Sequence, residues 1–212
     1  SFVRALCAKA PRAFQQVART PDRSVMIGEG NQVIAPIYGA PFVRDLKSGR
    51  RYGDMESFEK LVKLSYMHPH LHHTGLVICE PCDVPVSHRH LDMVYAHMTL
   101  GDKPHLGAIT EMSRAQDSVD MAEILHGREV MDQHCVIMGN VNTNSPLLVD
   151  KVVTEAIRGY CGRGQGIIVV PFILSGAMGP VSTAASVAQA MAEAMMVCAF
   201  SQLVRPGAPF VL

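Results

Sequence analysis

The sequence contains no tryptophan, and aromatic residues make up only 6% of its 212 positions. Its 19 lysines and arginines balance 19 aspartates and glutamates, so no excess charge attracts nucleic acid or an anionic membrane over a distance. No uninterrupted apolar run approaches about 18 residues, which predicts that no segment spans a membrane. No GxGxxG motif follows a predicted strand. This absence removes the commonest reason to expect a doubly wound dinucleotide-binding sheet.

The six cysteines are spread thinly through apolar stretches of the chain. Disulfide-stabilised domains are small and dense in cysteine, so this spacing is typical of reduced thiols and predicts a cytoplasmic protein. With 48% hydrophobic and 18% charged residues, the chain is able to bury a sizeable core. Its length fits one large domain or a piece of something larger.

Short apolar runs without polar alternation recur about every 30 residues along most of the chain, with helical patterns between them. Such runs are typical of parallel strands that are covered on both faces. This period fits a doubly wound sheet or a (β/α)8 barrel, and the missing GxGxxG favours the barrel. The predicted strands begin at Leu76, His105, Cys135, Ile167 and Pro209.

Local signals predict where these elements begin and end. Side chains that commonly cap helices precede the helical patterns, one of them in a capping box and one followed by proline. A long last helix is predicted over 181–204. Pro171 is predicted to lie at a strand end, because proline cannot donate to a central ladder. The predicted helix openings are Asp54, Ser87, Ser113 and Ser145.

The first part of the chain lacks the strand–helix period. Residues 1–20 have a helical pattern, and two β-like runs over 25–27 and 33–37 flank Gly28–Asn31, which predicts a hairpin. Residues 41–52 have the composition of a loop. The basic cluster in this loop is interpreted as a solvated surface.

These patterns predict an α/β chain in two parts. Residues 1–53 form an N-terminal helix and hairpin extension, and residues 54–212 form about four and a half units of a (β/α)8 barrel that is truncated at its fifth strand. A half barrel leaves open sheet edges and a bare apolar face. We therefore expect the protein to form homo-oligomers, and we expect residues 1–212 alone to be inactive.

Active sites of such barrels gather at the carboxyl ends of the strands. Two carboxylates, three amides, a ring and a glycine-rich loop occupy those ends here. The carboxylates are able to balance a cation or accept a proton, and the amides are able to hydrogen-bond a polar substrate. The aromatic ring is able to bind a quaternary ammonium group, and the N-terminus of the helix after the glycine loop is able to bind an anion. No residue is assigned a catalytic role. The candidate substrate-binding residues are Glu80, Glu111, Asn140, Asn142, Asn144, Phe172, Ser175 and Gly179.

Each candidate also has a purely structural interpretation. Glu111 precedes a helix, where a solvated carboxylate favours the helix dipole. The asparagines are able to satisfy the backbone of their own turns. Tight packing explains glycines such as Gly179, and a core position explains Phe172.

A concentration of histidines near two cysteines raises the alternative of a zinc site. Four of these histidines precede the first predicted strand and would lie at its amino end, opposite the usual catalytic face. A single C-x-x-C without a second pair is also a weak signal, so no metal is predicted. The residues of this alternative are His68, His70, His72, His73, His88, His90, Cys79 and Cys82.

Four stretches of the chain carry long, specific motifs: HPHLHHTGLVICEPCDVP, SHRHLDMVYAHMTLGDKPHLG, NTNSPLLVD and PFILSGAMGPVSTAASVAQAMAEAM…QLVRPGAPFVL. They closely resemble the trimethylamine methyltransferase (MttB-type) family, from about Ala10 to Leu212. The resemblance implies a (β/α)8 barrel considerably longer than this chain. It also implies methyl transfer from a tertiary or quaternary amine to the cobalt of a separate corrinoid protein, as in methylamine metabolism and methanogenesis.

The resemblance leaves the subgroup open. Founding archaeal members carry pyrrolysine at a position that corresponds to residues beyond Leu212, whereas many bacterial relatives lack it and use glycine betaine or similar amines. No cofactor is expected on this chain itself, because the corrinoid belongs to the partner protein. The expected partners are that protein and a small methylated amine, without nucleic acid or membrane. The rival hypotheses are a non-catalytic barrel that binds a quaternary amine and a zinc-dependent hydrolase.

Overall fold

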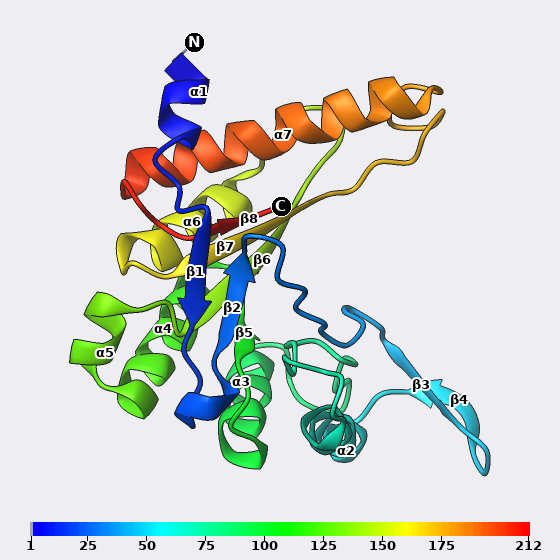
Figure 1. The fold of residues 1–212 in the computed structure, drawn as a ribbon. Coiled ribbons are helices and arrows are strands. Elements are labelled where there is room, and N and C mark those ends of the chain that lie inside the picture. The colour runs from blue at the N-terminus through cyan, green and yellow to red at the C-terminus, as the bar shows by residue number, and fades with distance from the viewer. Residues whose placement is uncertain (1) are drawn as a thin grey trace.

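The computed structural model describes residues 2–212 and shows an α/β chain around one parallel sheet (Figure 1). The four strands are neighbours in the order in which they occur along the chain, and all three pairings are parallel. The parallel arrangement predicted from the apolar runs is therefore confirmed for four of the five predicted strands. These strands are β5 (His105–Gly107), β6 (Ile137–Thr143), β7 (Gly166–Pro171) and β8 (Phe210–Val211).

The prediction of a strand that begins at Leu76 is wrong. Residues 74–75 lie beside β5, where Leu106 N–H donates to Gly75 O at 3.0 Å and Thr74 N–H donates to Pro104 O at 3.0 Å. Residues 76–79 bend instead, and Ile78 N–H donates back to Leu76 O at 3.1 Å. The two bonds beside β5 do not continue into a ladder. Residues 34–40 hydrogen-bond along the other side of this segment, so this edge of the sheet is not open.

Helices alternate with the strands and cover one face of the sheet. Contacts link α4 to β5 and β6, α6 to β6 and β7, and α7 to β7. Within the described residues the sheet does not close, and a barrel is not detected. The alternating helices are α3 (Arg89–Leu100), α4 (Met112–His126), α5 (Arg128–Gln133), α6 (Lys151–Gly162) and α7 (Thr183–Val204).

Close contact between the sheet and α6 requires glycine at two strand positions. A Cβ atom at Gly107 would lie 2.2 Å from the Tyr160 hydroxyl, and one at Gly139 would lie 2.7 Å from the Tyr160 ring. Tyr160 is fully buried and donates to Ala108 O at 2.7 Å. Since burial is the main cause that raises the pKa of Tyr160, the phenol stays neutral and serves as a donor in the core.

Helix α7 is longer and more apolar than the other helices. It extends beyond the sheet at its N-terminal end (Figure 1, orange) and contacts α1, α6 and β7. By length and composition alone α7 could cross a membrane, although buried core helices pass the same test. The long last helix predicted over 181–204 is this helix. Its sequence contains no uninterrupted apolar run of about 18 residues, because polar residues such as Gln189 and Glu193 interrupt it.

The N-terminal predictions are partly wrong. The helix predicted over 1–20 is only α1 (Phe2–Cys7), followed by β1 (Ala13–Gln16), and Ser1 lies outside the described residues. β1 pairs antiparallel with β2 (Val25–Gly28) after a 3₁₀ turn over Pro21–Arg23, so 33–37 is not the second strand of a hairpin. The reason is tertiary: the Gln16 side chain donates to His105 O at 3.0 Å, which holds β1 against the sheet.

Residues 41–52 form a projecting hairpin, β3 (Phe42–Asp45) and β4 (Gly49–Tyr52), and not the predicted loop (Figure 1). Asp45 closes its turn by accepting from Lys47 N–H at 2.8 Å and Ser48 N–H at 2.6 Å. These backbone hydrogen bonds, Ser48 first, lower the pKa of the Asp45 carboxyl. The turn chemistry was visible in the sequence as Asp45 with Gly49, whose φ is 68°.

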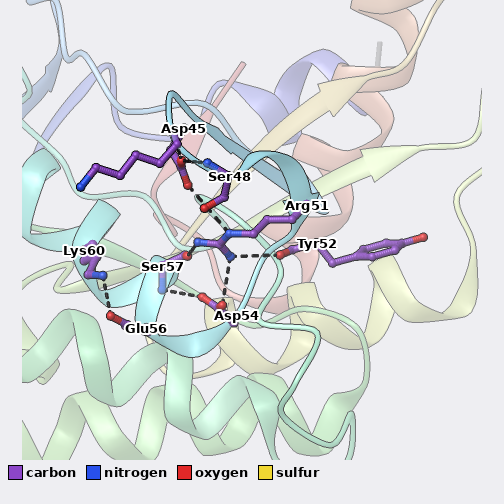
Figure 2. Close-up of polar contacts among 9 residues, drawn as sticks. Asp45, Ser48, Arg51, Tyr52, Asp54, Glu56, Ser57 and Lys60 are labelled. Atoms are coloured by element: carbon purple, nitrogen blue, oxygen red, sulfur yellow. Dashed lines mark hydrogen bonds and ion pairs between the residues drawn. The ribbon is translucent and has the colours of Figure 1, made fainter.

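The base of this hairpin is joined to α2 (Met55–Met67) through one guanidinium group (Figure 2). Arg51 donates to Asp54 at 2.9 Å and to Ser57 Oγ at 2.7 Å. Asp54 also accepts from Ser57 N–H at 2.8 Å, which confirms it as the N-cap of α2. Hydrogen bonds from Ser57, first through its side chain and then through its backbone, lower the pKa of Asp54.

The other three predicted helix openings shift by one, two and five residues. α3 begins after His88 and not after Ser87, and α4 begins after Glu111 without a side-chain cap, so the capping box at Ser113 is wrong. Asp150 caps α6, because the Ser145 hydroxyl donates elsewhere, to Glu193 at 2.8 Å. The last helix opens at the Ser182 cap, and Pro171 ends β7 as predicted.

Candidate functional site

The carboxyl ends of β6 and β7 present polar and aromatic side chains on the face opposite the helices. The register places Asn140 opposite Ile168 and Asn142 opposite Val170, whereas the alternate residues Val141 and Val169 are buried. Since side chains alternate along a strand, Asn140 and Asn142 share this face. Phe172 follows β7 and is 60% exposed, so a core position does not account for it.

The three candidate asparagines differ in their hydrogen bonding. Asn144 satisfies its own turn: its amide donates to Asp150 at 3.1 Å, and its backbone exchanges hydrogen bonds with Leu148. Asn142 is exposed. The Asn140 Oδ1 atom is buried and has no hydrogen-bond partner among the described residues. An unpaired amide oxygen beside an open face is able to accept a hydrogen bond from a ligand.

The glycine-rich loop after β7 is explained largely by packing. Ser175 Oγ lies 2.9 Å from Ser186 Oγ, and Gly176 N–H donates to Gly179 O at 3.0 Å. A Cβ atom at Gly179 would lie 2.6 Å from the Ile173 side chain. These contacts assign Ser175 and Gly179 to the internal structure of the loop, and no contact points them toward a ligand.

Glu80 lines a cavity of about 200 Å³ near the carboxyl end of β5. Its carboxylate accepts from Arg89 at 3.3 Å, and Arg89 also donates twice to Val84 O at 3.0 and 2.8 Å. Tyr38 lines the same cavity, where burial and then the Glu80 charge raise the pKa of its hydroxyl to about 12. The residues around this cavity are Tyr38, Leu76, Val77, Glu80, Val86, Arg89, His90, Met93, Ala108, Ile109, Thr110 and Arg114.

Glu111 lies at the edge of this region and does not line the cavity. Its carboxylate accepts from Arg114 at 3.1 Å, and its side chain is 60% exposed. Arg114 also donates to Thr110 Oγ1 at 3.1 Å. The structure thus brings Glu80 and Glu111 to the same end of the sheet, each paired with an arginine that the sequence reading did not single out.

Sequence reasoning missed Glu193, the one charged residue of α7 and a fully buried one. Its carboxylate accepts from Thr143 Oγ1, Ser145 Oγ at 2.8 Å, Leu147 N–H at 2.9 Å and Gln189 at 3.1 Å. Burial raises the pKa of Glu193, but these hydrogen bonds outweigh it and the net shift is downward. Glu193 therefore fixes the loop that follows Asn142 as an ionised acceptor.

The histidines considered for zinc do not gather into a metal site. Among residues 2–212 no three His, Cys, Asp or Glu side chains converge as ligands. One of them, His73, is buried at the amino end of the sheet. His97 and His105, which were not part of the zinc alternative, are buried there as well, and their rings stack at 5.7 Å. Burial lowers the pKa of His73 and His97 to about 3 and that of His105 to about 4.

Comparisons with known proteins agree with the motif resemblance. The family model described as "Trimethylamine methyltransferase (MTTB)" matches residues 1–212. A curated relative, the glycine betaine methyltransferase of Desulfitobacterium hafniense (strain Y51), is 33% identical over 211 residues. That match covers 99% of this chain and 44% of the relative, so the chain spans less than half the length of that protein.

Proposed function

This chain belongs to the trimethylamine methyltransferase family, and from that premise we propose that the full-length protein moves a methyl group from a methylated amine to the Co(I) of a separate corrinoid protein. A quaternary amine of the glycine betaine type is the preferred substrate in this proposal. The observation that carries it is the 33% identity to a glycine betaine methyltransferase across almost the whole chain. A tertiary amine such as trimethylamine is the second choice.

The parallel sheet supports a (β/α)8 architecture for the full-length protein, which remains a proposal. Four strands lie in chain order with helices on one face, as they would in part of a barrel. The open face of β6 and β7 would then line the barrel interior, with Asn140, Asn142 and Phe172 toward its mouth. The division into 1–53 and 54–212 also stays a prediction.

The proposed chemistry needs orientation more than acid–base catalysis. A quaternary nitrogen already carries positive charge. When the Co(I) electron pair forms the new bond to the methyl carbon, the C–N electron pair returns to nitrogen and a neutral tertiary amine leaves. The chain's task is to hold the substrate in line and to balance its charges. Glu80 and the Phe172 ring suit the cation, and the Asn140 and Asn142 amides suit the carboxylate of a betaine.

The test uses the full-length protein, a reduced corrinoid protein and spectroscopic detection of cobalt methylation. Glycine betaine should be turned over faster than trimethylamine. Its charged nitrogen leaves as a neutral tertiary amine, whereas unprotonated trimethylamine would have to expel a dimethylamide anion, which is a far poorer leaving group. Phe172→Ala should lower turnover about tenfold, the size of a lost cation–π contact together with misorientation. Binding of glycine betaine without any cobalt methylation would instead identify a silent amine-binding protein.

A further inference from the structure

The hairpin β3–β4 projects from the body of the chain beside the end of the sheet that carries the candidate site (Figure 1). The residues at its base are joined to that end. Glu80 N–H donates to Ala40 O at 2.9 Å, and Cys82 N–H donates to Gly53 O at 2.9 Å. Glu80 itself lines the cavity near the carboxyl end of β5. Each strand of the hairpin has four residues, so it extends about 13 Å from this base at about 3.3 Å per residue.

One face of the hairpin, which we call the inner face, is turned toward its own chain. The register places Val43 opposite Arg51, and Asp45 lies on the same face because side chains alternate along a strand. Val43 packs against the hydrophobic core. Arg51 is held by Asp54 and Ser57, as Figure 2 shows, and it lies 3.9 Å from Asp45. The charged groups of the inner face are therefore paired within the chain.

The outer face of the hairpin consists of Phe42, Arg44, Arg50 and Tyr52. Its two arginines lie directly opposite each other, and like charges in this position destabilise a pair of strands. The Arg50 guanidinium lies 3.7 Å from the centroid of the Phe42 ring, which packs 4.6 Å from the Tyr52 ring. Among residues 2–212 neither arginine forms an ion pair with a carboxylate. An acidic surface on another molecule would supply the missing opposite charge.

The exposed tip of the hairpin adds apolar surface beside these charges. Leu46 is 106% exposed, and the neighbouring Lys47 is exposed as well. Tyr52 on the outer face is 64% exposed. Exposed aromatic and arginine side chains are the groups that contribute most of the binding energy at protein interfaces. Two copies of the outer face would repel each other, because its charges have one sign, so a symmetric contact of this face with itself is disfavoured.

We propose that the outer face and Leu46 form the docking surface for the corrinoid protein that accepts the methyl group, and that this partner presents an acidic surface with an apolar depression. The inference rests on the proposed function, because methyl transfer brings the partner's cobalt to the carboxyl end of the sheet. The hairpin stands beside that end and leaves Arg44 and Arg50 free on the side that faces away from its own chain. Complementary charge steers an encounter and fixes its orientation, which suits a partner that must leave after each transfer.

The surface is tested by isothermal titration of the full-length protein with its corrinoid protein at low and at physiological ionic strength. Wild-type binding should weaken as ionic strength rises. Arg44→Gln combined with Arg50→Gln should weaken binding about tenfold and remove most of this salt dependence. Leu46→Ser should weaken binding about tenfold and keep the salt dependence. The matched control is Lys9→Gln combined with Arg128→Gln, which removes two exposed charges outside the hairpin and should leave binding unchanged.

Cobalt methylation is measured in parallel with the corrinoid protein and with free cob(I)alamin, which needs no docking surface. The hairpin variants should lose turnover with dilute corrinoid protein and keep wild-type turnover with free cob(I)alamin. Unchanged binding and salt dependence in the double arginine variant would overturn the inference. An altered oligomeric state in sedimentation, with unaltered corrinoid-protein binding, would assign the hairpin to contacts between copies and would also overturn it. Wild-type protein that binds the corrinoid protein but methylates neither acceptor would contradict the methyl-transfer proposal alone.

Discussion

The two ends of the parallel sheet use polar side chains in opposite ways. At the amino end, the fully buried Gln165 accepts from Val136 N–H at 2.8 Å and donates to carbonyl groups that include Met131 O. At the carboxyl end, Asn142 is exposed and Asn140 Oδ1 has no partner in the described chain. Gln165 thus completes the fold at the amino end, whereas Asn140 and Asn142 keep polar atoms available at the carboxyl end.

This contrast indicates where substitutions should affect stability and where they should affect binding. A buried polar group with all its partners is costly to remove, because the partners lose their hydrogen bonds away from water. An exposed polar group contributes little to folding. In α/β proteins with parallel strands, binding sites lie at the carboxyl ends, and the open side chains of this chain follow that rule.

The largest effect on stability is expected at low pH, because three histidines are buried at the amino end of the sheet. The pKa values of His73, His97 and His105 are lowered from 6.5 to about 3, 3 and 4 by burial. The unfolded chain therefore binds more protons below pH 6.5. Stability is fully present above that pH and is lost as the pH falls toward 4, by up to about 4 kcal/mol per pH unit for three protons. Urea unfolding at pH 7, 6 and 5 measures this slope.

His97→Gln sharpens this prediction, because glutamine keeps a donor for Leu76 O but does not titrate. The change in the free energy of unfolding per pH unit should therefore become smaller by the contribution of one of the three protons. His68→Asn, at an exposed histidine, is the control and should leave the slope unchanged. Equal slopes in wild type and His97→Gln would contradict the assignment of acid sensitivity to this cluster.

Gln165→Leu at the amino end should lower the free energy of unfolding by about 3 kcal/mol, since the N–H groups of Val136 and Ile137 lose a shared acceptor. Gln133→Leu, at an exposed position nearby, should change it by less than about 0.5 kcal/mol. Thermal and chemical denaturation measure both. Similar losses for the two variants would show that the amino end is not held by Gln165.

Glu193→Gln should cost about 2 kcal/mol of stability, because one acceptor oxygen becomes a donor that faces the donors of the 143–147 loop. Turnover of the full-length protein should also fall, since this loop follows Asn142. Glu155→Gln on α6, which forms an ion pair with the exposed Lys151, is the control. A Glu193→Gln protein with wild-type stability and turnover would contradict an anchoring role.

Asn142→Ala should have the smallest effect on folding, below about 0.5 kcal/mol, because the side chain is exposed. Methyl transfer by the full-length protein should nevertheless fall about tenfold, the size of one lost hydrogen bond to a charged substrate. Asn144→Ala is the matched comparison, since its amide serves its own turn. Reduced turnover in Asn144→Ala alone would reverse the roles assigned to the two asparagines.

Much of the fold was predictable wherever a local pattern coincided with burial. Continuous apolar runs identified β6 and β7, and Pro171 marked a strand end, because these features reflect the environment of each residue on its own. The cap at Asp54 was also predictable from sequence. The cap of α6 was not, because Glu193, distant in sequence, accepts the hydroxyl of the predicted cap Ser145, and Asp150 caps the helix instead.

The candidate site was predictable only as a set of strand-end residues. The sequence identified Glu80, Glu111 and the asparagines, but it contained no signal for the arginine partners of the two carboxylates. A lone glutamate in an otherwise apolar helix was the available signal for Glu193. It was missed because a single charge on a helix usually faces solvent.

By itself, the sequence determined the family, the parallel strand–helix order and the end of the sheet at which polar side chains collect, since each follows from motifs or from local hydrophobic patterning. Only the tertiary structure decided that β1 pairs with β2, that residues 34–40 lie along the 72–80 segment, and which of the polar side chains satisfy one another. The physical reason is that hydrogen-bond partners distant in sequence are chosen by geometry after the chain has packed.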